Sequence, residues 1–298
     1  MGGLRSFPPS VVVAVKALAC ELPRRLGLPV SRFSMSELKR EAERQGLVAS
    51  TGESTLWRWL TEDAIRPWQF RSWIFPRARD FAEKASRILD LYQRSWNGRP
   101  LKSDDYVISS DEKTSIQARD RVHPTTPPRR GASARVEHEY RRRGALAYLA
   151  AWDVHRGVVF GRCEKTTGIA PFARLVDQVM DQPPYRSASR VFWIVDNGSS
   201  HRGDKAAARL QQQWPNAILV NTPCHASWLN QVEIYFSVLQ RKVLTPNDSA
   251  DLSQLEELIL AFERHYMAIA KPFQWKFTRR DLSQLLENLE ATQHRLAA

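Results

Sequence analysis

The sequence predicts an α/β protein in which a mixed sheet flanked by helices follows an all-α N-terminal region. Apolar residues recur at helical spacing up to about residue 97, and short apolar runs typical of strands begin at residue 106. In the later part the expected order is three strands, helix, strand, helix, strand, helix. This order favours an antiparallel meander at one side of the sheet and parallel strands at the other.

The composition indicates a folded, basic protein. The chain has 298 residues, which is long enough for two domains or for one large core with an appended module, and 43% of them are hydrophobic, which is enough to fill a core. Lys and Arg number 44 against 32 Asp and Glu, so the formal net charge is +12. Such a balance favours a polyanionic partner, most commonly nucleic acid, although a solvated basic surface gives the same count.

Cysteine usage and the first residues indicate a cytoplasmic protein. Cys20, Cys163 and Cys224 form no CxxC pair, which argues against a zinc site and a disulfide framework and favours a reducing compartment. The first apolar stretch contains Lys16 and follows two prolines. We interpret it as a soluble helix rather than a signal peptide or a membrane span, and we expect no membrane partner.

Two capping boxes predict two helices in quick succession between residues 34 and 64. SMSE pairs Ser34 with Glu37, and STGE pairs Ser50 with Glu53, so that each side chain satisfies a free backbone N–H. Two short helices joined through GLVAST resemble a helix-turn-helix, although an ordinary helical hairpin fits equally well. The basic, aromatic continuation RPWQFRSWIFPRAR favours DNA binding.

The second of these helices is expected to present polar and aromatic side chains toward a DNA groove. These side chains are Ser54, Thr55, Trp57 and Arg58. We therefore predict a helix-turn-helix DNA-binding region over residues 1–78, followed by a connecting region over residues 79–100 with an amphipathic helix at 79–97.

Residues 101–247 are predicted to form the α/β domain. The expected strands are YVIS (106–109), GALAYLAAWDV (144–154), VVFGRC (158–163), RVFWIV (190–195) and AILV (217–220). The expected helices are 168–182, 204–214 and a long one from Trp228 to about Leu244. Residues 119–143, rich in Pro, Gly and Arg, are expected to form a mobile basic loop, and residues 248–298 C-terminal helices that pack on the core.

Three acids fall at positions that can converge on one edge of the sheet. Asp111 comes just after the first strand, and Asp196 ends a parallel strand, where open α/β sheets tend to build their sites. Glu233 is placed on the long helix, about 80–90° from the centre of its apolar stripe. Asn230 and Ser237, at i−3 and i+4, are expected to share its face and to orient it.

These three carboxylates predict a site for divalent cations. Converging carboxylates repel one another unless a cation is bound. Oxygen-only ligands favour Mg²⁺ or Mn²⁺ over zinc. Two such ions about 3.5–4 Å apart activate a water or a 3′-hydroxyl and stabilise the leaving oxygen of a phosphodiester. We therefore expect two ions held by Asp111, Asp196 and Glu233.

Each acid also has an ordinary explanation. Asp196 before Asn-Gly can cap a turn, Glu233 can be a solvated helix residue, and Asp111 can cap the start of a loop. Nearby Glu112 is a rival of Asp111 that the pattern alone does not remove. It points to the other face of the same strand.

Two histidines lie near the predicted acids. His201 comes five residues past Asp196, and His225 precedes the helix that carries Glu233. Either can contact a substrate phosphate or assist proton movement. A hydrogen-bonded loop residue is the commoner role for such a histidine, and we favour it here.

Three segments, DEKTSIQAR, VDNGSSHRG and HASWLNQVEIYFSVLQRKVL, strongly resemble the DDE transposases of bacterial insertion sequences related to the Tc/mariner superfamily. The resemblance covers about residues 30–290, and the 36 residues between Asp196 and Glu233 are similar to that family's short second spacing. It implies an RNase H-like catalytic domain behind the helix-turn-helix region. It also implies Asp111, rather than Glu112, as the first member of a catalytic, metal-binding triad with the other two acids.

The resemblance further implies a function. Members of this family cut at the ends of their element, join the free 3′-hydroxyl to target DNA and prefer TA targets. We therefore expect a bacterial, nucleoid-associated enzyme that acts as a homodimer on double-stranded DNA, namely the terminal inverted repeats and the target.

One departure and two other functions accompany that expectation. Relatives carry more helical DNA-binding sequence before the equivalent of VVVAVKALACELP, whereas about ten residues precede it here, so we expect part of the end-recognition module to be missing. The main alternative is a non-catalytic DNA-binding regulator or an inactive relic. A structure-specific nuclease of the same fold, which hydrolyses without strand transfer, also stays open.

Overall fold

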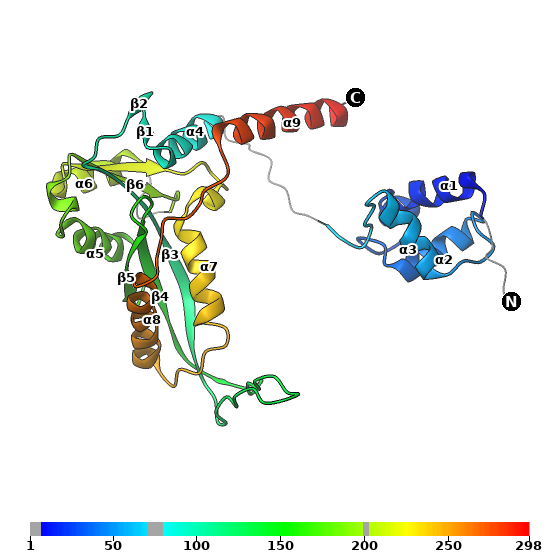
Figure 1. Cartoon of the computed structure of the whole chain (residues 1–298), viewed down its shortest axis with the longest axis horizontal. Coiled ribbons are helices and arrows are strands. Elements are labelled where there is room, and N and C mark those ends of the chain that lie inside the picture. The colour runs from blue at the N-terminus through cyan, green and yellow to red at the C-terminus, as the bar shows by residue number, and fades with distance from the viewer. Residues whose placement is uncertain (1–6, 71–79, 199–202, 298) are drawn as a thin grey trace. The chain divides into compact units, whose positions relative to one another are not determined.

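The chain forms two compact units in a computed structural model that describes residues 7–70, 80–198 and 203–297 (Figure 1). The units are Met1–Ile74 and Phe75–Ala298. Within the described part of the chain, no helix is long and apolar enough to cross a membrane.

The N-terminal unit is built from three helices, α1 (Pro9–Ala19), α2 (Met35–Arg44) and α3 (Glu53–Glu62). Their apolar faces enclose a core to which each helix contributes, including Val15, Leu38 and Leu60. A short 3₁₀ turn, η1 (Pro23–Leu26), lies between the first two helices.

Only one of the two predicted capping boxes is present. At the start of α2 the Ser34 hydroxyl accepts from the Glu37 amide at 3.2 Å, and the Glu37 carboxylate accepts from the Ser34 amide at 2.7 Å. The prediction for Ser50 and Glu53 is wrong, because Gly52 is the N-cap of α3 and no side chain caps it. The backbone of Gly52 is extended, with φ of −84° and ψ of 145°, so Glu53 is the first helical residue rather than the third.

The second unit contains a five-stranded mixed sheet in the order β5-β4-β3-β6-β7. Its strands are β3 (Asp105–Asp120), β4 (Arg141–Asp153), β5 (Val158–Glu164), β6 (Arg190–Val195) and β7 (Ala217–Asn221). The first three pair antiparallel, and β6 and β7 run parallel to β3. The predicted meander with parallel strands at its other side is therefore confirmed.

Helices cover both faces of this sheet. One face packs against α4 (Phe81–Tyr92), α7 (Val232–Lys242), α8 (Leu252–Met267) and α9 (Arg279–Ala297). The other packs against α5 (Ile169–Met180) and α6 (Asp204–Gln213). Side chains alternate along β3, so Val107 faces the first set of helices and Ile108 the second. Figure 1 shows α7 lying alongside β3.

Several element boundaries differ from the sequence prediction. The strand expected at 106–109 continues to Asp120, because β4 pairs with its polar second half, with Asp111 opposite Ala150. The basic loop is correspondingly shorter, and residues 121–140 carry two isolated bridges, Thr126 to Arg135 and Arg129 to Ala132.

Two predicted helices are shorter than expected. The helix expected at 79–97 ends at Tyr92, and a small hairpin of β1 (Ser95–Trp96) and β2 (Arg99–Pro100) follows it. The helix expected from Trp228 is broken. Its first part is a 3₁₀ turn, η3 (Ser227–Leu229), and α7 begins only at Val232.

Candidate active site

The face of β3 that points toward α7 carries three polar residues at alternate positions, Ser109, Asp111 and Lys113. They share this face with Val107, which packs in the α7-side core. The alternation puts Glu112 on the opposite face. Asp111 therefore lies in the middle of a long strand, and not just after a short one as the sequence predicted.

Asn230 connects this face of β3 to the start of α7. Its side chain is 1% exposed, and its amide nitrogen donates to the Ser110 carbonyl at 2.9 Å and to Asp111 Oδ2 at 3.2 Å. Its amide oxygen accepts from the Ser109 hydroxyl, which in turn accepts from the Val232 amide at 2.9 Å. Strand and helix start are thus fixed to each other through a buried polar network.

This arrangement corrects the expected role of Asn230. Because η3 ends just before it and its backbone is extended (ψ 109°), Asn230 is not on the helix that carries Glu233. Its side chain holds Asp111, and only its backbone carbonyl accepts from the Glu233 amide, at 3.1 Å. Ser237 lies on α7 itself and is exposed.

Asp196 follows β6 directly and caps the next turn. Its Oδ1 accepts from the Gly198 amide at 2.7 Å, and its backbone carbonyl accepts from the Asn221 side chain at 3.0 Å. Asn197 donates to the Thr222 carbonyl at 2.7 Å, so the segments after β6 and β7 are tied together. The capping role anticipated for Asp196 is therefore real, and it leaves the carboxylate at the carboxyl edge of the parallel strands.

Asp111 interacts with the two other predicted acids. The pKa of Asp111 is raised to about 7, chiefly by burial and also by the nearby charges of Asp196, Glu233 and Glu112, while the Glu112 amide lowers it. Three acids from β3, the end of β6 and α7 therefore lie within electrostatic range of one another.

Glu233 stands in the first turn of α7 and is half-buried. Burial raises the pKa of its carboxyl group, Lys113 lowers it, and Asp196 raises it again. Lys113 is therefore a further member of the site. The sequence offered one signal for it, namely its position two residues after Asp111 on the same face of a strand.

The three proposed acids fit a hard divalent cation, because they offer only carboxylate oxygens as ligands. Among the described residues, no three His, Cys, Asp or Glu side chains already lie close enough together to bind one ion. Oxygen-only ligands of this kind suit Mg²⁺ or Mn²⁺.

Of the two histidines near the acids, only His225 lies among the described residues. His201 lies outside the described residues. His225 is exposed and has a left-handed backbone, with φ of 61°. It lines a hollow of about 360 Å³ beside Asp196, together with the residues that follow β7.

The predicted DNA-contacting residues lie on α3 in the N-terminal unit. Ser54, Trp57 and Arg58 are exposed, and Thr55 is half-buried. Trp57 is 53% exposed, which is unusual for so large an apolar side chain. A hollow of about 460 Å³ adjoins this helix and is lined in part by Thr55 and Arg58.

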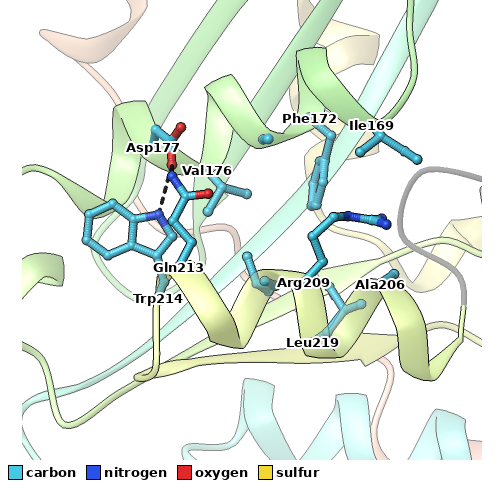
Figure 2. Close-up of a pocket in the computed structure, with 11 residues that line it drawn as sticks. Ile169, Phe172, Val176, Asp177, Ala206, Arg209, Gln213, Trp214 and Leu219 are labelled. Carbon is cyan, nitrogen blue, oxygen red and sulfur yellow. Dashed lines mark hydrogen bonds between the residues drawn. The ribbon is translucent and has the colours of Figure 1, made fainter.

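A third, more apolar pocket lies between α5 and α6, on the sheet face opposite to α7 (Figure 2). Phe172 and Val176 line it with Leu219, and Asp177 at one end accepts from Trp214 Nε1 at 2.8 Å and from Gln213 at 2.7 Å. Asp177 is thus engaged in joining the two helices. None of the three acids of the candidate site lines this pocket.

Comparisons with known proteins identify the family and the fold of the chain. Residues 106–258 match the family model described as DDE superfamily endonuclease. The Mos1 transposase paired-end complex with left transposon end is 14% identical over 97% of this chain and 80% of that chain, with a TM-score of 0.52. The Mos1 strand transfer complex is 14% identical over 97% of this chain and 79% of that chain, with a TM-score of 0.51. A search of curated proteins found no match. The solved structures confirm the predicted RNase H-like fold class.

Proposed function

The chain belongs to the DDE superfamily endonucleases, and from this premise we propose that it is a DNA transposase that cuts and joins DNA strands with the help of divalent cations. The observation that carries the proposal is the mutual electrostatic interaction of Asp111, Asp196 and Glu233, which come from three separate elements. Asn230 holds the first of these acids against the start of the helix that carries the last.

In this proposal the three carboxylates hold two Mg²⁺ or Mn²⁺ ions. When bound, such ions activate a water or a 3′-hydroxyl and stabilise the leaving oxygen of a phosphodiester. The chain's own residues set the geometry. Asn230 fixes the orientation of Asp111, the Gly198 amide fixes that of Asp196, and the docked first turn of α7 presents Glu233. Lys113 offers a positive charge beside Glu233 for a substrate phosphate.

Charge supports double-stranded DNA as the partner. The chain has a formal net charge of +12. Arg129, Arg130 and Arg135, on the loop between β3 and β4, are exposed, and no carboxylate of the described residues pairs with them. We propose that this loop and the N-terminal unit both contact DNA phosphates, and that α3 enters a groove with Trp57 and Arg58.

Two of the similar solved structures are a paired-end complex with a transposon end and a strand transfer complex. By analogy we propose that this chain binds the terminal inverted repeats of its own element, acts as a homodimer on them and joins them to a TA target. The proposed division of labour assigns DNA recognition to residues 1–78 and catalysis to residues 101–247.

The test is cleavage of a labelled duplex that carries the element's own ends, with Mg²⁺ or Mn²⁺ present. The wild type should release a 3′-hydroxyl and join it to a second duplex that contains TA. Glu233→Gln should abolish both products, whereas Glu257→Gln, which removes the same charge from an exposed position on α8, should leave them unchanged. Release without joining would favour a nuclease, and binding without release would favour a DNA-binding regulator.

A further inference from the structure

The hydroxyl group of Tyr92 is inserted into the break between η3 and α7. Tyr92 is the last residue of α4, and its hydroxyl donates to the Leu229 carbonyl at 2.6 Å. The same oxygen accepts from the Gln231 amide at 3.3 Å. Leu229 is fully buried and Gln231 is 1% exposed, so water does not readily replace these bonds.

The two backbone groups bound by Tyr92 lie on either side of Asn230. The Asn230 side chain bonds Asp111, and its backbone carbonyl accepts from the Glu233 amide. A shift of this turn would therefore move two of the three proposed metal ligands at once. Position matters to a fraction of an ångström in such a site, because ions of this size demand regular geometry.

Tyr92 is itself held from the C-terminal part of the chain. The ring of Trp275 packs edge-on against it, with centroids 5.2 Å apart. Two residues before Tyr92, Asp90 forms a bidentate ion pair with Arg279 at the start of α9, at 2.7 and 2.8 Å. The end of α4 is thus fixed by contacts with the C-terminal part of the chain, and the Tyr92 hydroxyl connects it to the turn before α7.

We propose that Tyr92 is a positioning residue for the active site, which sets the Leu229–Gln231 turn and through it Asp111 and Glu233. This rests on the proposed roles of the two acids as metal ligands. Outer residues that orient metal ligands are worth about 10- to 100-fold in metal affinity or activity. Loss of the Tyr92 hydroxyl should therefore weaken Mn²⁺ binding about ten-fold while the fold persists.

The experiment measures Mn²⁺ affinity by electron paramagnetic resonance on the full chain, with thermal unfolding in parallel. Tyr92→Phe removes only the hydroxyl, and Tyr185→Phe is the matched control. Tyr185 is fully buried and its hydroxyl donates to Asp153 at 2.7 Å, in a network that includes none of the three acids. Tyr92→Phe should raise the Mn²⁺ dissociation constant about ten-fold, and excess Mn²⁺ should restore much of its cleavage rate. Tyr185→Phe should lower the melting temperature and leave Mn²⁺ affinity unchanged.

Wild-type Mn²⁺ affinity in folded Tyr92→Phe would overturn the inference. If Tyr92→Phe does not fold, Ser109→Ala decides, because Ser109 holds the same turn from β3 through Asn230 and Val232. An unchanged affinity in that variant would likewise overturn it. Glu233→Gln distinguishes a failure of the proposed metal triad from a failure of the proposed role of Tyr92. If Glu233→Gln binds Mn²⁺ as tightly as the wild type, the metal triad is wrong, and the role of Tyr92 is wrong with it.

Discussion

The side chain of Asn230 donates a hydrogen bond of 3.2 Å to the carboxylate of Asp111, although 118 residues (112–229) lie between them in the sequence. The same amide group also bonds the Ser110 carbonyl and the Ser109 hydroxyl. One buried side chain therefore joins the middle of β3 to the turn that precedes α7.

Asn230→Ala should lower both stability and activity. It leaves a buried carbonyl and a buried hydroxyl without their partner, which costs about 1–3 kcal/mol for each such group. We expect the free energy of unfolding in urea to fall by about 2–4 kcal/mol and the cleavage rate to fall at least about ten-fold. A variant as stable as the wild type would show that this network does not fix strand to helix.

Removing charge from the loop between β3 and β4 should weaken DNA binding through phosphate contacts. In the triple variant Arg129→Gln, Arg130→Gln, Arg135→Gln, the slope of log affinity against log salt should become shallower by about 2–3 units, because each lost phosphate contact contributes about 0.9. Binding to a random-sequence duplex over a salt series measures this slope.

The matched control for that variant removes three exposed guanidinium groups elsewhere, at Arg186, Arg264 and Arg280. It should keep the wild-type slope. Equal slopes for both triple variants would mean that general basicity, and not this loop, contacts DNA.

The ion pair between Asp105 and Arg190 should govern acid stability. Asp105 is fully buried, and Arg190 donates to it at 3.0 and 2.6 Å across the β3–β6 pair. Burial by itself raises the pKa of Asp105, but the bonds from Arg190 and the Lys102 amide bring that pKa below its ordinary value of 3.8. The stabilisation is thus present above about pH 3.8 and is lost as the pH falls through the depressed value.

Arg190→Gln should therefore cost about 3 kcal/mol at neutral pH, since it leaves a buried carboxylate without its counter-charge. The difference in the free energy of unfolding between variant and wild type should shrink as the pH falls below 3.8, the ordinary pKa of an aspartate. Urea unfolding over a pH series measures both. A difference that grows toward low pH would contradict the assignment.

Glu263 should have the opposite pH dependence. Burial raises the pKa of this carboxyl group, whereas the Tyr148 hydroxyl, which donates to it at 2.7 Å, lowers it. A raised pKa in the folded state means that the contribution to stability is complete below the unfolded value and is lost as the pH rises through the folded one. Glu263→Gln should reduce this loss of stability with rising pH. The melting temperature of the variant should therefore rise relative to that of the wild type between acid and neutral pH. Parallel pH profiles would refute this.

The sequence was sufficient for the elements whose signal is local. The capping box of Ser34 and Glu37 and the apolar run of β6 each depend on neighbouring residues, and both are present. The sequence was insufficient where contacts with residues distant in the chain determine the bounds of an element. The polar second half of β3 is a strand because β4 pairs with it, and the helix expected from Trp228 breaks because Asn230 bonds β3.

The same distinction holds for the site. Asp111, Asp196 and Glu233 were proposed from the sequence because each falls at the end or flank of an element that the sequence predicts, although Asp111 lies in the middle of the actual strand. Lys113 was missed, although alternation along β3 places it on the same face as Asp111. Tyr92 gave no signal at all, because its partners are backbone groups 137 and 139 positions away in the sequence.

The most direct test of the account is cleavage of an element-end duplex by Asp196→Asn, by Glu233→Gln and by the variant that carries both. If the acids act as one unit on the metal, each single variant should lose nearly all cleavage, and the double variant should be scarcely slower than either. DNA binding should persist or tighten, because less negative charge faces the phosphates. A wild type that cuts, together with a Glu233→Gln variant that cuts at a similar rate, would contradict the account.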